Sequence, residues 1–98
     1  MNMQQLMFQA QKMQRELKKA KDALHAKEFS INKAGAVSIT VKGDKSIVKI
    51  DIDKDALEDK EMIEDMIAMA LNEVFEQIDE EEAEIDERLT GRSGGMGF

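Results

Sequence analysis

The sequence predicts an α+β protein of the order α-β-β-β-α, in which a three-stranded antiparallel meander lies between two long helices. Near both ends of the chain, apolar residues recur every three or four positions, as in amphipathic helices. Over residues 28–52 the apolar period changes to two, which is typical of strands with one buried face. The 98 residues are enough for one domain and no more.

The first helix is predicted from an apolar seam that runs through three heptads. Its positions step by three and four without interruption: Met3, Leu6, Ala10, Met13, Leu17, Ala20 and Leu24. Gln, Lys and Arg fill many of the remaining positions, as in coiled-coil helices. At 1.5 Å per residue the seam is roughly 33 Å long. A small sheet alone cannot cover it, so we expect a second helix to pack against it.

Three strands of alternating polarity are predicted next, separated by turn signals at 33–35 and 43–44. A three-stranded sheet leaves two edges with unpaired backbone groups, and these favour pairing with a second copy of the chain. We therefore expect a homodimer joined through the sheets and helix bases, with the helix ends standing away as arms. The residues expected to build the sheet core and the dimer seam are Val37, Ile39, Val41, Val48, Ile50 and Ile52.

The second helix is predicted to extend to Leu89. Asp55 with Glu58 resembles a capping box, and Asp59 offers a second start. Beyond Ile78 the apolar stripe thins inside a run with seven acidic residues among 79–87, so this end is expected to leave the core and project. The single domain then spans 1–89, and the Gly-rich residues 90–98 are expected to form a flexible tail. The main stripe is Ile63, Met66, Ile67, Ala70, Val74 and Ile78.

The net charge of −7 is unevenly distributed. Residues 1–27 hold six Lys or Arg against two acidic residues, whereas residues 54–98 hold four against fifteen. The basic first helix favours contact with nucleic acid, while the overall charge opposes it. The acidic run at 79–87 is either a solvated face or a partner for the basic helix of the same or another subunit. It lacks the Asp-rich loop that wraps calcium, so a metal site is not expected.

Five cations of the first helix form the candidate DNA-binding set: Lys12, Arg15, Lys18, Lys19 and Lys21. Three of them, Lys12, Arg15 and Lys19, share one face that points away from the apolar seam. Flexible cations along a rod suit contact with phosphates, because such contact needs no fixed geometry. The alternative is a solvated helix face that only keeps the protein soluble.

No catalytic residues, metal ligands, cofactor or small-molecule substrate are expected. The chain has no Cys, and its only histidine, His25, has no partner set for a metal site or a catalytic triad. The Gly-rich segment 94–97 lacks the Lys-Ser/Thr pair of a phosphate loop. No run resembles a signal peptide or a membrane span, which favours a cytoplasmic protein.

Several segments are shared, in order and spacing, with a known family. They are Met-Gln-Gln-Leu at 3–6, Gln-Lys-Met-Gln at 11–14, Ala-Gly-Ala-Val-Ser-Ile-Thr-Val-Lys-Gly at 34–43, Lys-Ile-Asp-Ile-Asp at 49–53, Asp-Lys-Glu-Met-Ile-Glu-Asp-Met-Ile at 59–67 and Met-Gly-Phe at 96–98. Together they resemble the YbaB/EbfC family of bacterial nucleoid-associated proteins, over nearly the whole chain. The resemblance implies an α-β-β-β-α homodimer shaped like tweezers, which binds double-stranded DNA with little sequence preference. It also implies a cytoplasmic location at the nucleoid.

The resulting hypothesis is a non-enzymatic, DNA-binding homodimer whose first-helix cations contact the phosphate backbone. The alternative is an adaptor dimer that binds other proteins through coiled-coil arms and does not bind DNA. The two differ in their response to salt, because only phosphate contact predicts an affinity that falls steeply as the salt concentration rises.

Overall fold

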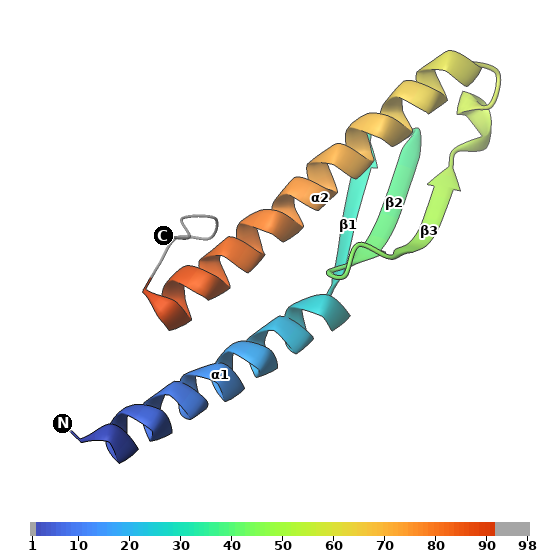
Figure 1. Ribbon diagram of the computed structural model, residues 1–98. Coiled ribbons are helices and arrows are strands. Elements are labelled where there is room, and N and C mark those ends of the chain that lie inside the picture. The colour runs from blue at the N-terminus through green and yellow to red at the C-terminus, as the bar shows by residue number, and fades with distance from the viewer. Residues whose placement is uncertain (1, 92–98) are drawn as a thin grey trace.

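The computed structural model describes residues 2–91 and confirms the predicted α+β order (Figure 1). Two helices and three strands follow one another, with one short 3-10 turn, η1, before the second helix. The elements are α1 (Met3–Ala26), β1 (Glu28–Lys33), β2 (Val37–Lys42), β3 (Ile47–Ile52), η1 (Lys54–Ala56) and α2 (Lys60–Thr90). Gly91 caps α2 in a left-handed conformation with φ 73°. The tail predicted at 90–98 begins too early, because Thr90 is the last residue of α2, and residues 92–98 lie outside the described part of the chain.

Side-chain caps fix where the helices begin. The Asn2 side chain accepts a hydrogen bond from the backbone N–H of Gln5 at 2.8 Å, and the Gln5 side chain accepts one from Asn2 in return. The Asp59 carboxylate accepts from the N–H of Met62 at 3.1 Å and starts α2. The capping box predicted at Asp55 is wrong, because Asp55 lies inside η1, where it donates its N–H to the Asp53 carboxylate.

The sheet has the strand order β1-β2-β3, with both pairs antiparallel. Helix α2 packs on β1 and β2 but makes little contact with β3. The apolar side chains of the central strand, Val37, Ile39 and Val41, are at most 1% exposed beneath it. The opposite face is polar: Ser30 and Thr40 hydrogen-bond across the strands at 3.1 Å, and Asn32 bonds Ser38 at 2.6 Å. One sheet face is therefore dry and the other wet, as the alternation predicted.

Strand β3 is an edge strand with an uncovered apolar face. Ile50 is paired with Ile39 and therefore points to the same dry side of the sheet. Ile39 is fully buried, yet Ile50 is 42% exposed because α2 does not reach over β3. Ile47 and Val48 are each 49% exposed, near an irregularity of the pairing at the start of the strand. The dry face of the sheet therefore extends onto β3, beyond the strands that α2 of the same chain covers.

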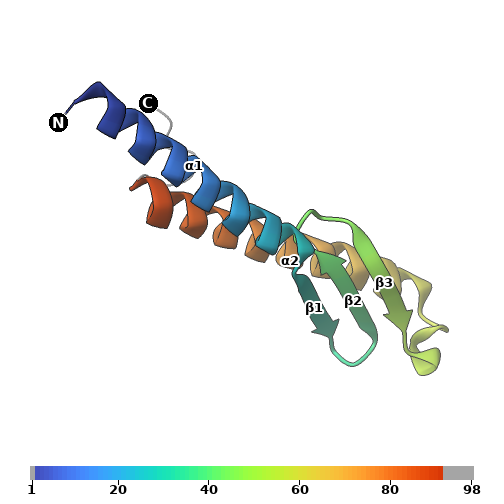
Figure 2. The ribbon, with the colours of Figure 1, turned by 90° about the horizontal axis from the view of Figure 1, so that it is seen from below.

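Beyond the sheet, α2 runs back along α1 in the opposite direction (Figures 1 and 2). Leu24 of α1 and Ile85 of α2 are buried in the same core cluster, and Leu17 and Leu89 pack against it. The acidic end of α2 does extend beyond the sheet, but the expectation that it leaves the core is wrong, since it packs on α1. The molecule is elongated: its radius of gyration is 18.8 Å, against about 13 Å for a compact chain of this length.

One close approach locks the sheet to the end of α1. The N–H of Gly43, in the β2–β3 turn, donates to the carbonyl of Lys27 at 2.9 Å. A Cβ placed at Gly43 would lie 1.8 Å from the carbonyl oxygen of Leu24. Only glycine allows the turn to pack this closely against the helix end.

Replacing Gly43→Ala is therefore expected to lower the free energy of unfolding by about 3 kcal/mol, because the clash is with backbone and no side chain can move aside. Urea unfolding followed by circular dichroism measures this. The control is Gly35→Ala, whose Cβ would meet open space. The alanine would have to keep the left-handed φ of 70° of this position, which costs about 1 kcal/mol. Equal midpoints for the two variants would contradict the packing described above.

Candidate nucleic-acid interface

The cations predicted from the sequence all lie on α1, but they differ in their surroundings. Lys12, Arg15, Lys18 and Lys19 are exposed, and Lys21 is partly buried against α2. Leu17, Ala20 and Leu24 mark the side of α1 that packs on α2. At about 100° per residue, Lys12 and Arg15 fall on the side of the helix that faces away from α2. Lys19 lies at the edge of this side, where it also lines a groove with Arg88 and Leu89 of α2.

Among residues 2–91, three of the five cations have no ion-pair partner. Within residues 2–91, no carboxylate lies within 4 Å of Lys12, Arg15 or Lys19. Lys18 is 2.6 Å from Asp22, one helical turn further along. The hydrogen bond to Asp22, followed by the charge of that carboxylate, raises the pKa of the Lys18 ammonium. Both side chains are largely exposed, so DNA phosphates and salt can compete for this pair.

The acidic run of α2 pairs with basic residues of the same chain. Lys21 lies 2.9 Å from Asp86 and 3.9 Å from Glu82. Further ion pairs join Lys27 to Glu81 at 2.7 Å and Lys45 to Asp79 at 2.8 Å, and His25 lies 4.0 Å from Glu82. Of the two alternatives left open by the sequence, the structure shows pairing with the basic helix of the same chain. Lys21 is thereby held against α2.

This pairing separates the two signs of charge across α1. The acids of α2 lie on the side of α1 that bears Leu17, Ala20 and Leu24, whereas Lys12, Arg15 and Lys19 lie roughly opposite. The inner cations are neutralised by α2, and the outer cations face solvent. A polyanion that approaches α1 from the outer side therefore meets a local excess of positive charge in spite of the net charge of −7.

An exposed aromatic residue shares the outer face of α1. Phe8 is 62% exposed and precedes Lys12 by four residues and Arg15 by seven, which places all three on one side of the helix. Phe8 was not among the residues predicted to bind DNA, although its spacing from Lys12 alone places it on this face. At the tip of α1, Phe8 and side-chain amides line a shallow groove: Asn2, Gln4, Gln5 and Gln9. Amides and aromatic rings are groups that contact bases, as cations contact phosphates.

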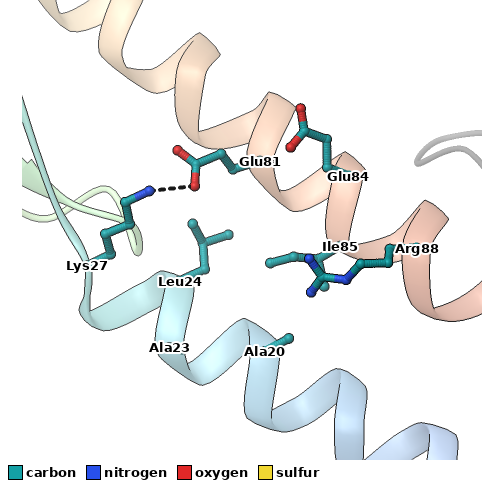
Figure 3. A pocket seen from close by; sticks show the side chains of 8 residues that line it. All are labelled: Ala20, Ala23, Leu24, Lys27, Glu81, Glu84, Ile85 and Arg88. Atoms are coloured by element: carbon teal, nitrogen blue, oxygen red, sulfur yellow. Dashed lines mark hydrogen bonds and ion pairs between the residues drawn. The ribbon is translucent and has the colours of Figure 1, made fainter.

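The groove between the two helices has a different character (Figure 3). It encloses about 280 Å³, and the ion pair of Lys27 with Glu81 crosses one end of it. Small side chains of α1 leave the space, and side chains of both signs line it: Ala20, Ala23, Leu24, Lys27, Glu81, Glu84, Ile85 and Arg88. Because its acids offset its bases, this groove does not suit a phosphate chain. The outer face of α1 is the better candidate.

Among residues 2–91, no three His, Cys, Asp or Glu side chains are grouped so that they could hold a metal ion. None of the helices described is both long enough and apolar enough to cross a lipid bilayer.

Comparison with known proteins gives consistent matches over the whole length. A model of the YbaB/EbfC DNA-binding family matches residues 1–93. A nucleoid-associated protein of Mycoplasmopsis pulmonis is 37% identical over 100 residues, covering 100% of this chain and 97% of its own. One of Xanthomonas campestris is 43% identical over 96 residues, covering 97% and 88%. The crystal structure of an uncharacterized Helicobacter pylori protein aligns with a TM-score of 0.79 and 24% identity, covering 93% of this chain and 99% of that one, and shows the same fold.

Proposed function

The chain belongs to the YbaB/EbfC DNA-binding family, and we propose that it binds double-stranded DNA as a homodimer with little sequence preference, at the nucleoid in the cytoplasm. The observation that carries the proposal is a row of cations on the outer face of α1 that have no ion-pair partner in the described part of the chain: Lys12, Arg15 and Lys19. The names of the related proteins support the nucleoid as the site of action. The family consists of DNA-binding proteins and not of enzymes.

The spacing of these cations suits the phosphate backbone. Lys12 and Lys19 are seven residues apart, or about 10 Å along the helix axis, which equals about three base-pair steps at 3.4 Å each. Long, flexible side chains on such a rod reach several phosphates without a fixed orientation. Phosphate contacts position a protein on DNA but carry no sequence information. Weak sequence preference is the expected result.

Lys18 and Lys21 have subsidiary roles in this proposal. Lys18 must exchange Asp22 for a phosphate, which costs little because both groups are exposed. Lys21 is held by Asp86 and Glu82, and its side chain is only 30% exposed. We therefore assign Lys21 chiefly to the packing of α2 on α1, with a smaller share in DNA contact than Lys12, Arg15 or Lys19.

For the homodimer, we propose that the seam lies along β3. Val48 and Ile50 are half-exposed there, and Ile52 is partly buried beside them. Three other residues expected in the dimer seam are instead buried in the core of a single chain: Val37, Ile39 and Val41. They lie on β2, next to the proposed seam on β3. A second copy placed against β3 would cover the dry face that α2 leaves open and satisfy the exposed strand edge. Each dimer would then carry two α1 arms.

The first test replaces the outer cations together, as Lys12→Ala, Arg15→Ala and Lys19→Ala. Three lost phosphate contacts on each of two arms reduce the slope of log affinity against log salt by about 5. Fluorescence anisotropy with a labelled duplex over a salt series measures the slope. Alanine favours helix, so α1 is expected to stay folded.

The matched control removes the same charge elsewhere, at the exposed Lys42, Lys54 and Lys60. This control is expected to leave the slope close to that of the unmodified protein. Equal slopes for the two triple variants would contradict phosphate contact by α1. An adaptor that does not bind DNA would show no salt-dependent affinity for DNA in any variant.

The second test addresses Phe8. Its replacement by Ala is expected to weaken binding to duplex DNA about threefold, because a ring against the edge of a stacked duplex gains less than the roughly 1–3 kcal/mol of a base that stacks on it in a single strand. The salt slope should not change, because no charge is lost. Met7→Ala serves as the control, because Met7 is a similarly exposed neighbour on another face of the helix. If Phe8→Ala binds DNA like the unmodified protein, the ring is outside the interface.

The third test addresses the dimer. Ile50→Asp would place a charge in the proposed seam, where it would be buried without a partner. Light scattering is expected to give the mass of a monomer for this variant and of a dimer for the unmodified protein. Lys42→Asp, on the exposed outer face of β2, is expected to remain dimeric. A dimeric Ile50→Asp variant would place the seam elsewhere.

A further inference from the structure

The outer half of α1 carries an apolar seam that no described part of the chain covers. Helix α2 packs against Leu17, Ala20 and Leu24, but it ends at Thr90, beside the groove that Glu16 and Lys19 help to line. Every residue from 2 to 16 is exposed. The large seam residues are among them, with 71% exposure for Met3, 50% for Leu6 and 41% for Met13.

Such a helix is unlike an ordinary solvated arm. An isolated helix of this length is only marginally stable in water, and apolar residues gathered in one stripe usually mark a contact surface. No charged side chain occurs before Lys12, so residues 2–11 lack the charges that normally keep a free helix soluble. The stripe therefore points to a helical partner.

We propose that this half of α1 pairs antiparallel with the same half of α1 from a second molecule, at an interface separate from the β3 seam. In this arrangement Leu6 packs against Ala10 of the second copy, and Met3 packs against Met13 of the second copy. Along the seam the layers are then Met3 with Met13 and Leu6 with Ala10, each occurring twice, so that the large Leu6 lies opposite the small Ala10 and flexible Met side chains lie opposite each other.

In this register the positions of each pair, 6 with 10 and 3 with 13, are centred on residue 8 of α1. A two-fold axis therefore relates the two helices, and the contact joins identical surfaces and closes on itself.

Charge supports the same occupant. Uncharged residues flank the seam, Gln9 on one side and Gln14 on the other. Two copies therefore meet without repulsion, whereas a basic or acidic partner would gain nothing from this surface. The cations Lys12, Arg15 and Lys19 lie on the opposite face and remain available when the seam is covered.

The proposed contact also continues packing that the chain already contains. The inner part of the same seam packs on an antiparallel helix, α2. The second α1 would lie in line with α2 and begin where α2 stops. Its N-terminus would then meet the C-terminal end of α2, and helix ends of opposite partial charge attract each other.

The contact is small and is expected to be weak. Interfaces well below about 1,200 Å² belong to transient complexes, and each arm contributes only four seam residues: Met3, Leu6, Ala10 and Met13. Binding to one DNA molecule would raise the local concentration of dimers and favour the pairing. Arms paired in this way present their cations outward, so that joined dimers would bridge two DNA segments.

Cysteine cross-linking without DNA tests the register, and because no DNA is present its result does not depend on the proposed function. The chain has no Cys of its own, and a disulfide requires Cα atoms closer than about 7 Å. A mixture of Leu6→Cys and Ala10→Cys proteins, treated with oxidised glutathione, should give a 6–10 cross-link. Each variant alone should give much less, and Gln4→Cys mixed with Ala10→Cys should give none.

Two results would overturn the proposal. Predominant 6–6 cross-links in the Leu6→Cys protein alone would show parallel arms. No cross-link in the mixture would show that the seam is covered otherwise, by residues 92–98 of the same chain or by a different protein.

A second measurement uses Leu6→Glu, with Gln4→Glu as the matched control. Sedimentation at high protein concentration should show that Leu6→Glu loses the species larger than the dimer, while Gln4→Glu keeps them. Circular dichroism confirms that both variants stay folded. Larger species that persist in Leu6→Glu would overturn the proposal.

Discussion

The continuous apolar stripe of α2 is the constraint on which the rest of the structure depends. Its first half, at Ala70 and Val74, buries the dry face of β1 and β2, and its second half, at Ile85, buries Leu24 of α1. One helix thereby fixes the sheet and the arm in a single orientation. The ion pairs of α2 with Lys21, Lys27 and Lys45 are partly exposed and add little stability individually. They favour this register of the two helices over others.

Periodicity was sufficient to predict the elements and their order, because it depends only on which side of each element is apolar. It could not tell which neighbour covers that side. Val41 and Ile50 follow the same alternation, yet one is completely buried and the other is not, since α2 extends over two strands and leaves the third open. The ion pair of Lys21 could not be predicted from the sequence either. Its partner Asp86 lies 65 residues further along the chain, and only the packing of the two helices brings them together.

The separation of charge explains how an acidic protein offers a basic surface. The acids of α2 neutralise the cations that face them, and the outer cations of α1 find no carboxylate partner among the residues that the structure describes. At physiological salt, charges are screened beyond about 8 Å. A phosphate at the outer face of α1 therefore responds mainly to the nearest cations and only weakly to acids on the far side of the helix. The net charge of the protein would matter mainly to a DNA molecule far from its surface, and at such distances salt screens most of the electrostatic interaction.

The difference in reach between α1 and α2 gives the two halves of α1 different roles. Where α2 lies alongside, the seam is internal packing, and beyond Thr90, the last residue of α2, none of the described residues covers the same seam. An α2 longer by three or four turns would have buried Leu6 and Met13 and left α1 with a single functional face. Because α2 stops short, α1 presents an apolar face and a cationic face on opposite sides of one rod. A rod with these two faces allows contact with protein and contact with DNA at the same time, since neither partner occupies the side that the other needs.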